Sequence, residues 1–261
     1  MDEKGNLQLK DFVTEGRCVR LIGEDIYSVV RDGPVRHHYD KRATLYDLIV
    51  GTRLYNSVMW GASPFDYVDF ARQALVSSSE GTFLDAGCGS LLFTGRTYAN
   101  SSRRIIAFDQ SLAMLRRARQ RLIKHSGCVP EHIRLLQADL NDLPFRRQSF
   151  RTVLCLNVLH QFADAASLIS NLNGLTTSTG NLYLTSLTST NRTIGNCYLR
   201  ALYATGEFVR PRSEQELRQL LTKAPGQEIS YRVKGNMAFI TTAYDSDKQE
   251  GAEAPSYKPL R

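Results

Sequence analysis

The sequence predicts an α/β protein built around a doubly wound, mostly parallel sheet of seven strands. From residue 82 to residue 186, short apolar segments alternate with amphipathic segments of helical period. This alternation is typical of strand–helix–strand units and therefore of parallel strands with helices on both faces. Two further apolar segments near the carboxyl end are separated by Lys234-Gly235-Asn236. So short a connection predicts an antiparallel hairpin that closes the sheet.

The composition is that of a globular protein. The chain has 261 residues, 42% hydrophobic and 23% charged, and a chain of this length buries roughly three quarters of its unfolded surface. Its five cysteines form no Cys-x-x-Cys pair, which argues against a disulfide framework and a zinc site. No run approaches the roughly 20 apolar residues of a membrane helix. We therefore expect a cytoplasmic protein without a membrane span or a bound metal.

Residues 1–78 are expected to form an N-terminal segment and a helical lid. Residues 18–22 and 26–30 are interpreted as a short hairpin. From Lys41 onward the apolar residues recur at helical spacing, which predicts a first helix. Ser63-Pro64 is typical of an N-cap followed by proline at the first helical position, which predicts a second.

Residues 79–244 are expected to hold the sheet. Strands are predicted at 82–85, 104–109, 133–138, 151–156, 181–186, 229–233 and 237–243. Helices are predicted after the first strand to about residue 99, at 111–124, at 163–172, at 198–203, and from Ser213, where Ser-Glu-Gln-Glu is a capping box. Residues 245–261 are polar and contain two prolines, so we expect a flexible tail.

The turn after the first strand is the first candidate binding element. The strand runs directly into Asp85-Ala86-Gly87-Cys88-Gly89, and a glycine turn before a helix lets a ligand approach the backbone. Asp109 ends the next strand, where an acid can accept hydrogen bonds from ribose hydroxyls. The pair indicates a nucleoside-containing ligand, and the alternative is an ordinary turn beside a surface acid.

Dinucleotides and nucleoside triphosphates fit this turn poorly. The third glycine of the dinucleotide motif falls at Leu92, and no Gly-Lys-Ser/Thr is present for a triphosphate.

Taken in order, the motifs of this region resemble those of the class I S-adenosylmethionine-dependent methyltransferases. The matching pieces are Phe83-Leu-Asp-Ala-Gly-Cys-Gly89, Asp109, Gln137-Ala-Asp139-Leu140, Leu143-Pro-Phe145, Ser149-Phe150 and Leu156-Asn-Val-Leu-His160. Their order is most similar to the small-molecule branch that includes the quinone-biosynthesis C-methyltransferases, and the resemblance covers residues 37–243. It implies a Rossmann-like fold, S-adenosylmethionine as cofactor and a small-molecule methyl acceptor.

The resemblance also implies which residues surround the cofactor. Its amino-acid end would contact Tyr39, Asp85, Ala86, Gly87, Cys88 and Gly89. Its ribose and adenine would contact Asp109, Gln110, Met114, Asp139 and Leu140. Asn157 would border the methyl-transfer site.

One of the departures from the family bears on the cofactor, and the acceptor side is less defined. The family usually has a third glycine where this chain has Leu91, and a bulky residue there is expected to crowd the methionine moiety or shift the helix start. His160 is a candidate general base, and Trp60 is a candidate for the wall of an acceptor pocket. A structural role is the alternative for both side chains.

The net charge of +7 favours anionic partners. Much of it falls within residues 103–124, on a predicted helix that turns its leucines inward, so we interpret these charges as a solvated outer face. Nucleic acid is therefore the less favoured partner. An RNA or protein methyltransferase and a cofactor-binding homologue without catalysis are the alternatives to a small-molecule enzyme.

Overall fold

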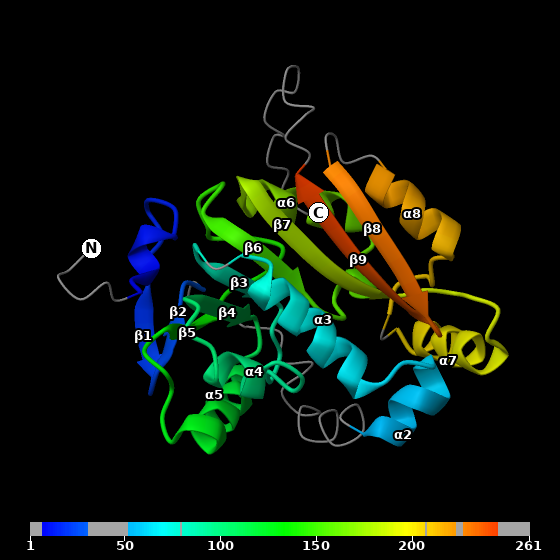
Figure 1. Cartoon of the computed structure of the whole chain (residues 1–261), viewed down its shortest axis with the longest axis horizontal. Helices are drawn as coiled ribbons and strands as arrows, with labels where there is room; N and C mark the ends of the chain where they lie inside the picture. Colours follow the sequence, from blue (N-terminus) through cyan, green and yellow to red (C-terminus); the bar gives the residue numbers. More distant parts are fainter. Residues whose placement is uncertain (1–6, 31–51, 79, 207, 223–226, 245–261) are drawn as a thin grey trace.

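A single nine-stranded sheet organises the chain in the computed structural model, which describes residues 7–30, 52–78, 80–206, 208–222 and 227–244 (Figure 1). The strands are β1 (Arg20–Gly23), β2 (Ile26–Ser28), β3 (Phe83–Ala86), β4 (Ile105–Asp109), β5 (Ile133–Gln137), β6 (Phe150–Cys155), β7 (Thr176–Leu187), β8 (Gln227–Lys234) and β9 (Met237–Tyr244). Their spatial order is β1-β2-β5-β4-β3-β6-β7-β9-β8. The pairings from β2 through β7 are parallel, and β9 lies antiparallel between β7 and β8.

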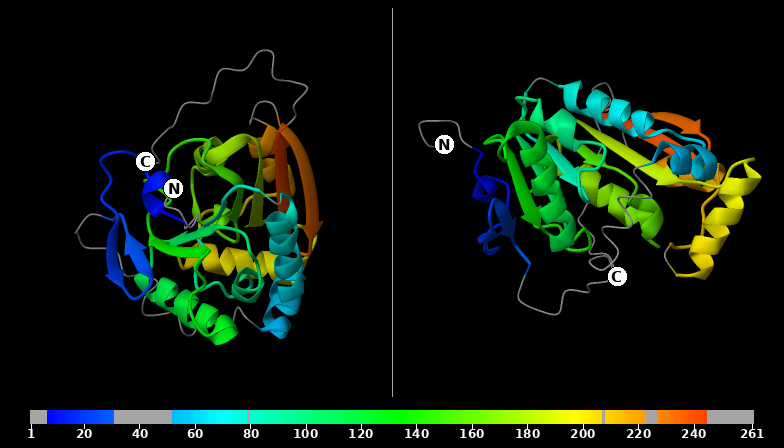
Figure 2. Two further views of the ribbon diagram at one scale, coloured as in Figure 1. Left: turned by 60° about the vertical axis from the view of Figure 1, so that its left-hand side comes forward. Right: turned by 90° about the horizontal axis from the view of Figure 1, so that it is seen from below.

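Helices cover both faces of this sheet (Figure 2). They are η1 (Leu9–Asp11), α2 (Arg53–Tyr55), η2 (Asn56–Trp60), α3 (Pro64–Val76), α4 (Gly95–Ala99), α5 (Leu112–Ser126), η3 (Leu159–Gln161), α6 (Ala165–Leu175), α7 (Thr193–Ala204) and α8 (Glu214–Thr222). The predicted α/β class, the parallel order and the closing antiparallel hairpin are confirmed.

The predicted number of seven strands is wrong, because the N-terminal hairpin joins the sheet. β1 and β2 pair antiparallel, as the sequence predicts, and β2 then pairs in parallel with β5. The seven-stranded expectation counted only strands of the βαβ series and of the closing hairpin. A pairing between segments more than one hundred residues apart leaves no local pattern in either segment.

Alternate residues of each strand pack into two separate cores. Leu84 and Ala86 of β3 belong to the core under α6 and α8. Phe83 faces the opposite core, under α3, α5 and α7. Strands with both faces covered need apolar residues at successive positions, which is why these strands read as continuous apolar runs.

The residues that follow η1 pack directly on the sheet domain. Val13 pairs with Phe145 in an isolated antiparallel bridge, and the ring of Phe12 stacks on Phe150 with centroids 5.4 Å apart. Arg17 forms a bidentate ion pair with Asp142. Residues 7–30 are thus part of the same folded unit as the sheet.

Both helix starts that the capping residues predict are present. Ser63 and Asp66 form a reciprocal capping box at the start of α3, with Pro64 at the first position. Ser213 and Glu216 form the second capping box, at the start of α8. Most of the first predicted lid helix, which begins at Lys41, and the predicted tail 245–261 lie outside the described residues.

Candidate functional site

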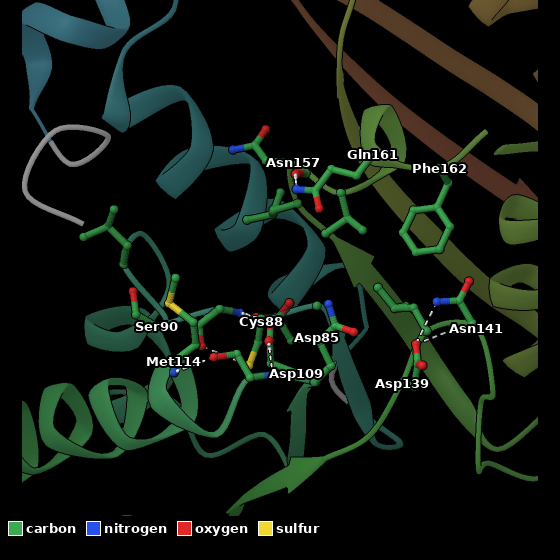
Figure 3. Close-up of a pocket in the computed structure, with 18 of the residues that line it drawn as sticks. Asp85, Cys88, Ser90, Asp109, Met114, Asp139, Asn141, Asn157, Gln161 and Phe162 are labelled. Atoms are coloured by element: carbon green, nitrogen blue, oxygen red, sulfur yellow. Dashed lines mark hydrogen bonds between the residues drawn. The ribbon is translucent and has the colours of Figure 1, made fainter. Parts of the chain in front are cut away.

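One cavity lies at the carboxyl ends of the parallel strands, where the chain order reverses. From β3 the chain runs to β4 and β5 on one side, and then crosses to β6 and β7 on the other. In doubly wound sheets, ligands bind outside the carboxyl ends of strands at such a switch point. The cavity here has a volume of about 420 Å³, and Figure 3 shows the side chains that project into it from the loops after β3, β4, β5 and β6.

The loop after β3 exposes its backbone to the cavity. Gly87 and Gly89 have φ values of 70° and 54°, a left-handed conformation that glycine adopts without strain. A Cβ on Gly87 would lie 2.8 Å from a methyl carbon of Val158, so this position also needs glycine for space. The turn therefore brings its backbone close to the cavity, while the N–H of Cys88 donates to the carbonyl of Phe108 at 2.9 Å and the N–H of Gly89 donates to Oδ2 of Asp109 at 2.9 Å.

Leu91, at the position of the missing glycine, also has a positive φ of 54°. A left-handed conformation costs a residue with a side chain about 1–2 kcal/mol. The Leu91 side chain is fully buried in the core under α3 and α5, and it does not line the cavity. Leu91 thus does not narrow the cavity, and α4 begins only at Gly95.

Asp109 connects the first two loops of the site. Its Oδ2 accepts a hydrogen bond from the backbone N–H of Gly89 at 2.9 Å, and its Oδ1 accepts one from the N–H of Ser111 at 2.8 Å. Both contacts fix the plane of the carboxylate at the cavity wall. Each oxygen can accept more than one hydrogen bond, so the group can still receive ligand hydroxyls.

Asp85 is the buried acid of the site. Its side chain lines the cavity although the residue is only 1% exposed. Its Oδ2 accepts a hydrogen bond from the hydroxyl of Tyr98 at 2.9 Å, whereas Oδ1 is buried without a hydrogen-bond partner among the described residues. Burial raises the pKa of Asp85 to about 7, against the opposing effect of the Tyr98 hydrogen bond.

Asp139 and Asn141 form a small polar unit on the other side of the cavity. Oδ1 of Asp139 accepts hydrogen bonds from the backbone N–H and the side-chain amide of Asn141, at 2.8 and 2.9 Å. Both residues line the cavity together with Leu140. Asn141 was not predicted, and its only signal in the sequence is its place two residues after Asp139.

Asn157, after β6, is held in a left-handed conformation with a φ of 57°. Its backbone N–H donates to Oγ1 of Thr185 at 2.8 Å, and the Thr185 hydroxyl donates back to Oδ1 of Asn157 at 2.9 Å. Asparagine tolerates this conformation better than most residues. The two hydrogen bonds fix the residue at the cavity wall.

The structure brings together most of the residues implied by the resemblance. Those that line the cavity are Asp85, Gly87, Cys88, Gly89, Asp109, Gln110, Met114, Asp139, Leu140 and Asn157. Ala86 is buried behind the wall, and Tyr39 lies outside the described residues. The lining residues that sequence reasoning missed include Ser90, Phe93, Ser111, Val158, Gln161 and Phe162.

His160 lies behind the cavity and does not line it. Its Nδ1 accepts a hydrogen bond from the backbone N–H of Leu187 at 3.3 Å, and its ring packs edge-on against Phe208. Burial, aided by the charge of Arg212, lowers the pKa of His160 to about 3. The imidazole is therefore neutral near pH 7, and its contacts are those of a structural residue.

Trp60 also packs in the core, with ring centroids 5.2 Å from Tyr198 and 6.2 Å from Tyr55. It does not line the cavity. Among the described residues, no three His, Cys, Asp or Glu side chains come together as a metal site. Within the same part of the chain, every helix is too short or too polar to cross a membrane.

Comparison with known proteins agrees with this geometry. Residues 84–184 match the family model described as a methyltransferase domain, and this range runs from β3 into β7, which is the part of the chain that builds the cavity. This part of the chain is therefore similar to methyltransferase domains. No protein of curated function matches the sequence.

Solved structures with the same fold are distant in sequence. An O-methyltransferase family 2 protein of Planctomyces limnophilus, solved with apigenin, is 22% identical over 82% of this chain and 63% of its own, with a TM-score of 0.58. A phosphoethanolamine N-methyltransferase of Haemonchus contortus, solved with phosphomonomethylethanolamine and S-adenosylhomocysteine, is 12% identical over 81% and 59%, with a TM-score of 0.61. DhpI, solved with S-adenosylhomocysteine, is 20% identical over 80% and 94%, with a TM-score of 0.52.

Proposed function

We propose that the cavity binds S-adenosylmethionine and that the protein transfers its methyl group to a small-molecule acceptor. The observation that carries the proposal is the Asp109 carboxylate, which is fixed between the Gly89 turn and the start of α5 at the switch point of the sheet. A carboxylate in this place is suited to the two ribose hydroxyls of a nucleoside cofactor.

The remaining groups of the cavity fit the other parts of this cofactor. The exposed backbone of the 87–89 turn and the unpartnered oxygen of Asp85 face an amino-acid end that carries an ammonium and a carboxylate. We assign the adenine to Asp139 and Leu140, because Oδ2 of Asp139 can accept from an exocyclic amine. Gln110 and Met114 would flank the ring, and Asn157 would border the transferred methyl group.

Methyl transfer asks mainly for positioning from this chain. The bound cofactor supplies a methyl group that is already activated by its sulfonium. The residues of the cavity then hold the acceptor in line with it and exclude water, which accounts for most of the acceleration in such reactions. A base is required only for an acceptor that must lose its proton. His160 stays a candidate for that role, although a pKa of about 3 makes it a weak base.

Three observations support a small acceptor. The cavity wall beyond the polar residues is apolar and includes Leu92, Leu156, Val158 and Phe162. Some of the basic side chains have partners within the protein: Arg119 pairs with Glu24 and Asp25, and Arg121 donates to the carbonyl of Ser90. Apigenin and phosphomonomethylethanolamine, the ligands of two proteins with this fold, are also small molecules. A quinone-like acceptor and a cytoplasmic location stay predictions of the sequence.

Calorimetric titration with S-adenosylmethionine and S-adenosylhomocysteine tests the cofactor site. We expect binding of both, and a large loss of affinity in Asp109→Ala, since that change removes the ribose contact and the anchor of the Gly89 turn. Asp69→Ala is the matched control, because Asp69 lies on the outer face of α3 in an exposed pair with Arg72. Failure of the wild-type protein to bind either ligand at millimolar concentration would refute the proposal.

The acceptor class is tested with labelled methyl donor. Transfer to members of a panel of lipophilic and aromatic small molecules supports the proposal. Transfer to mixed RNA or to proteins instead would favour the alternative methyltransferase classes, and cofactor binding without transfer to any acceptor would favour a non-catalytic homologue.

A further inference from the structure

The hydroxyl of Tyr98 connects α4 to Asp85, the acid near the carboxyl end of β3. Tyr98 is fully buried, and its ring packs edge-on against Phe83 at 5.6 Å. Its hydroxyl donates to Oδ2 of Asp85 at 2.9 Å. The direction of this bond is set by chemistry, because burial beside the carboxyl raises the pKa of Tyr98 well above its usual value and keeps the phenol protonated.

The other oxygen of Asp85 is left for a ligand. Oδ1 is buried and has no hydrogen-bond partner among the described residues, although Asp85 lines the cavity. A buried carboxylate oxygen without a donor costs free energy unless a ligand satisfies it. The partner that suits it best is a cationic donor, because attraction between opposite charges offsets the desolvation of the carboxylate.

In the described part of the chain, the titratable groups that act on Asp85 do not supply that cation. Asp109, at the end of β4, is a like charge that opposes ionisation of Asp85. Burial raises the pKa values of Cys88 in the turn and of Cys155 in β6, so both thiols are neutral near pH 7. Tyr98 is thus the protein group that favours the ionised form of Asp85.

We propose that Tyr98 is a positioning residue: it holds the Asp85 carboxylate by one oxygen so that the other receives the ammonium group of the amino-acid end of the cofactor. The inference rests on the proposed function and adds to it a residue outside the cavity wall, in α4, that decides how strongly the amino-acid end binds. The nucleoside end should be indifferent to Tyr98, because Asp109 and Asp139 hold that part of the ligand.

Two ligands distinguish binding at the amino-acid end of the cofactor from binding at its nucleoside end. S-adenosylhomocysteine carries the ammonium group, whereas 5′-methylthioadenosine has the same nucleoside and a thioether but no amino acid. In Tyr98→Phe, which keeps the ring against Phe83, we expect the dissociation constant for S-adenosylhomocysteine to rise about tenfold or more at pH 7, the size of a lost hydrogen bond to a charged group. The affinity for 5′-methylthioadenosine should stay unchanged.

The pH profile gives a readout that a structural role would not produce. The Tyr98 hydroxyl stabilises the ionised form of Asp85, so its loss leaves more of the carboxyl protonated near neutral pH. The affinity of Y98F for S-adenosylhomocysteine should therefore recover as the pH rises from 7 to 8.5, and its profile should lie at higher pH than that of the wild type. Tyr183→Phe, another buried tyrosine of the same core that does not line the cavity, is the matched control.

Asp85→Asn completes the experiment. It should weaken the binding of S-adenosylhomocysteine but not that of 5′-methylthioadenosine. Adding Y98F to this variant should change the affinity little further, because the two residues act through one contact. Should Y98F not fold, 3-fluorotyrosine at position 98 tests the opposite change, because its hydroxyl is a stronger hydrogen-bond donor. It should raise the affinity for S-adenosylhomocysteine and move the pH profile of that affinity to lower pH.

Equal losses of affinity for both ligands in Y98F would overturn the inference, as would an unchanged affinity for S-adenosylhomocysteine. If the wild-type protein binds neither ligand, the proposed function itself fails. That failure is recognised without any variant.

Discussion

The hydroxyl of Thr185 is bonded twice to Asn157: it accepts from the backbone N–H at 2.8 Å and donates to the side-chain oxygen at 2.9 Å. Thr185 is fully buried in β7, and Asn157 follows β6, so this contact ties the two strands together at the rim of the cavity. It also holds Asn157 at a φ of 57°, a conformation that needs support from its surroundings.

Thr185→Val should therefore lower the free energy of unfolding by about 1–3 kcal/mol, because a side chain of the same shape leaves the Asn157 N–H without its acceptor. Thr185→Ser keeps the hydroxyl and serves as the control, with most of the stability retained. Urea unfolding of the three proteins measures the effect. A valine variant as stable as the wild type would show that water or another group replaces the hydroxyl.

The local part of this architecture could be predicted from the sequence. Ser63 and Ser213 begin helices because capping residues act within one turn, and the apolar runs between them form the strands as expected. The cavity residues Asp85 and Asp109 could be placed because each lies at the carboxyl end of a strand, and these ends must share one edge of a parallel sheet.

The contacts that connect distant segments could not be predicted. The pairing of β2 with β5 depends on which edge of the sheet is free, and no short pattern carries that information. The bonds of Thr185 to Asn157 and of Tyr98 to Asp85 depend on side chains that meet only after the sheet has formed. The departure at Leu91 could be read from the sequence. The direction of its side chain could not, because packing turns that side chain into the core.

Leu91 itself can be tested with a pair of substitutions. Leu91→Ala deletes a fully buried side chain and should cost about 2–5 kcal/mol of unfolding free energy. Leu91→Gly deletes the same atoms and one more, yet it should be more stable than the alanine variant by about 1–2 kcal/mol, because glycine adopts a φ of 54° without strain. Thermal or urea unfolding gives this order.

The same two variants decide whether Leu91 affects ligand binding. Since its side chain does not line the cavity, both should keep the wild-type affinity for S-adenosylhomocysteine when measured below their unfolding transitions. A glycine variant that binds more tightly would show that the leucine does crowd the methionine side.

Gly195 in α7 provides a test of the packing between helix and sheet. In an exposed helix, replacing glycine by alanine stabilises by about 1 kcal/mol. A Cβ at Gly195, however, would lie 1.9 Å from Oδ1 of Asn236, which is fully buried and donates through its amide to the carbonyl of Thr188. Gly195→Ala should therefore destabilise the protein by about 1–3 kcal/mol, the usual range for overpacking.

Gly23→Ala is the matched control for Gly195→Ala. Gly23 ends β1, its φ is not positive, and a Cβ there would meet no atom within 4 Å. Its unfolding free energy should stay within about 0.5 kcal/mol of the wild type. Equal midpoints for both variants in urea unfolding would contradict the packing argument.

Asp85 should make the stability of the ligand-free protein depend on pH. Its carboxyl has a pKa of about 7 in the folded protein against an ordinary value of 3.8. Because the pKa of this carboxyl is higher in the folded protein, the stability that Asp85 contributes is fully present below the ordinary pKa of 3.8. That stability is lost as the pH rises through the folded pKa of about 7. The cause is the burial of a group that must carry a charge at high pH.

Asp85→Asn has no charge to bury, so it should gain stability relative to the wild type by about 2–3 kcal/mol between pH 5 and pH 8. Urea unfolding at successive pH values measures this difference, with Asp69→Asn as the control because that exposed side chain stays in contact with water in both states. A difference between D85N and the wild type that stays constant with pH would mean that Asp85 is ionised in the folded protein across this range, and that a donor other than Tyr98 satisfies its second oxygen.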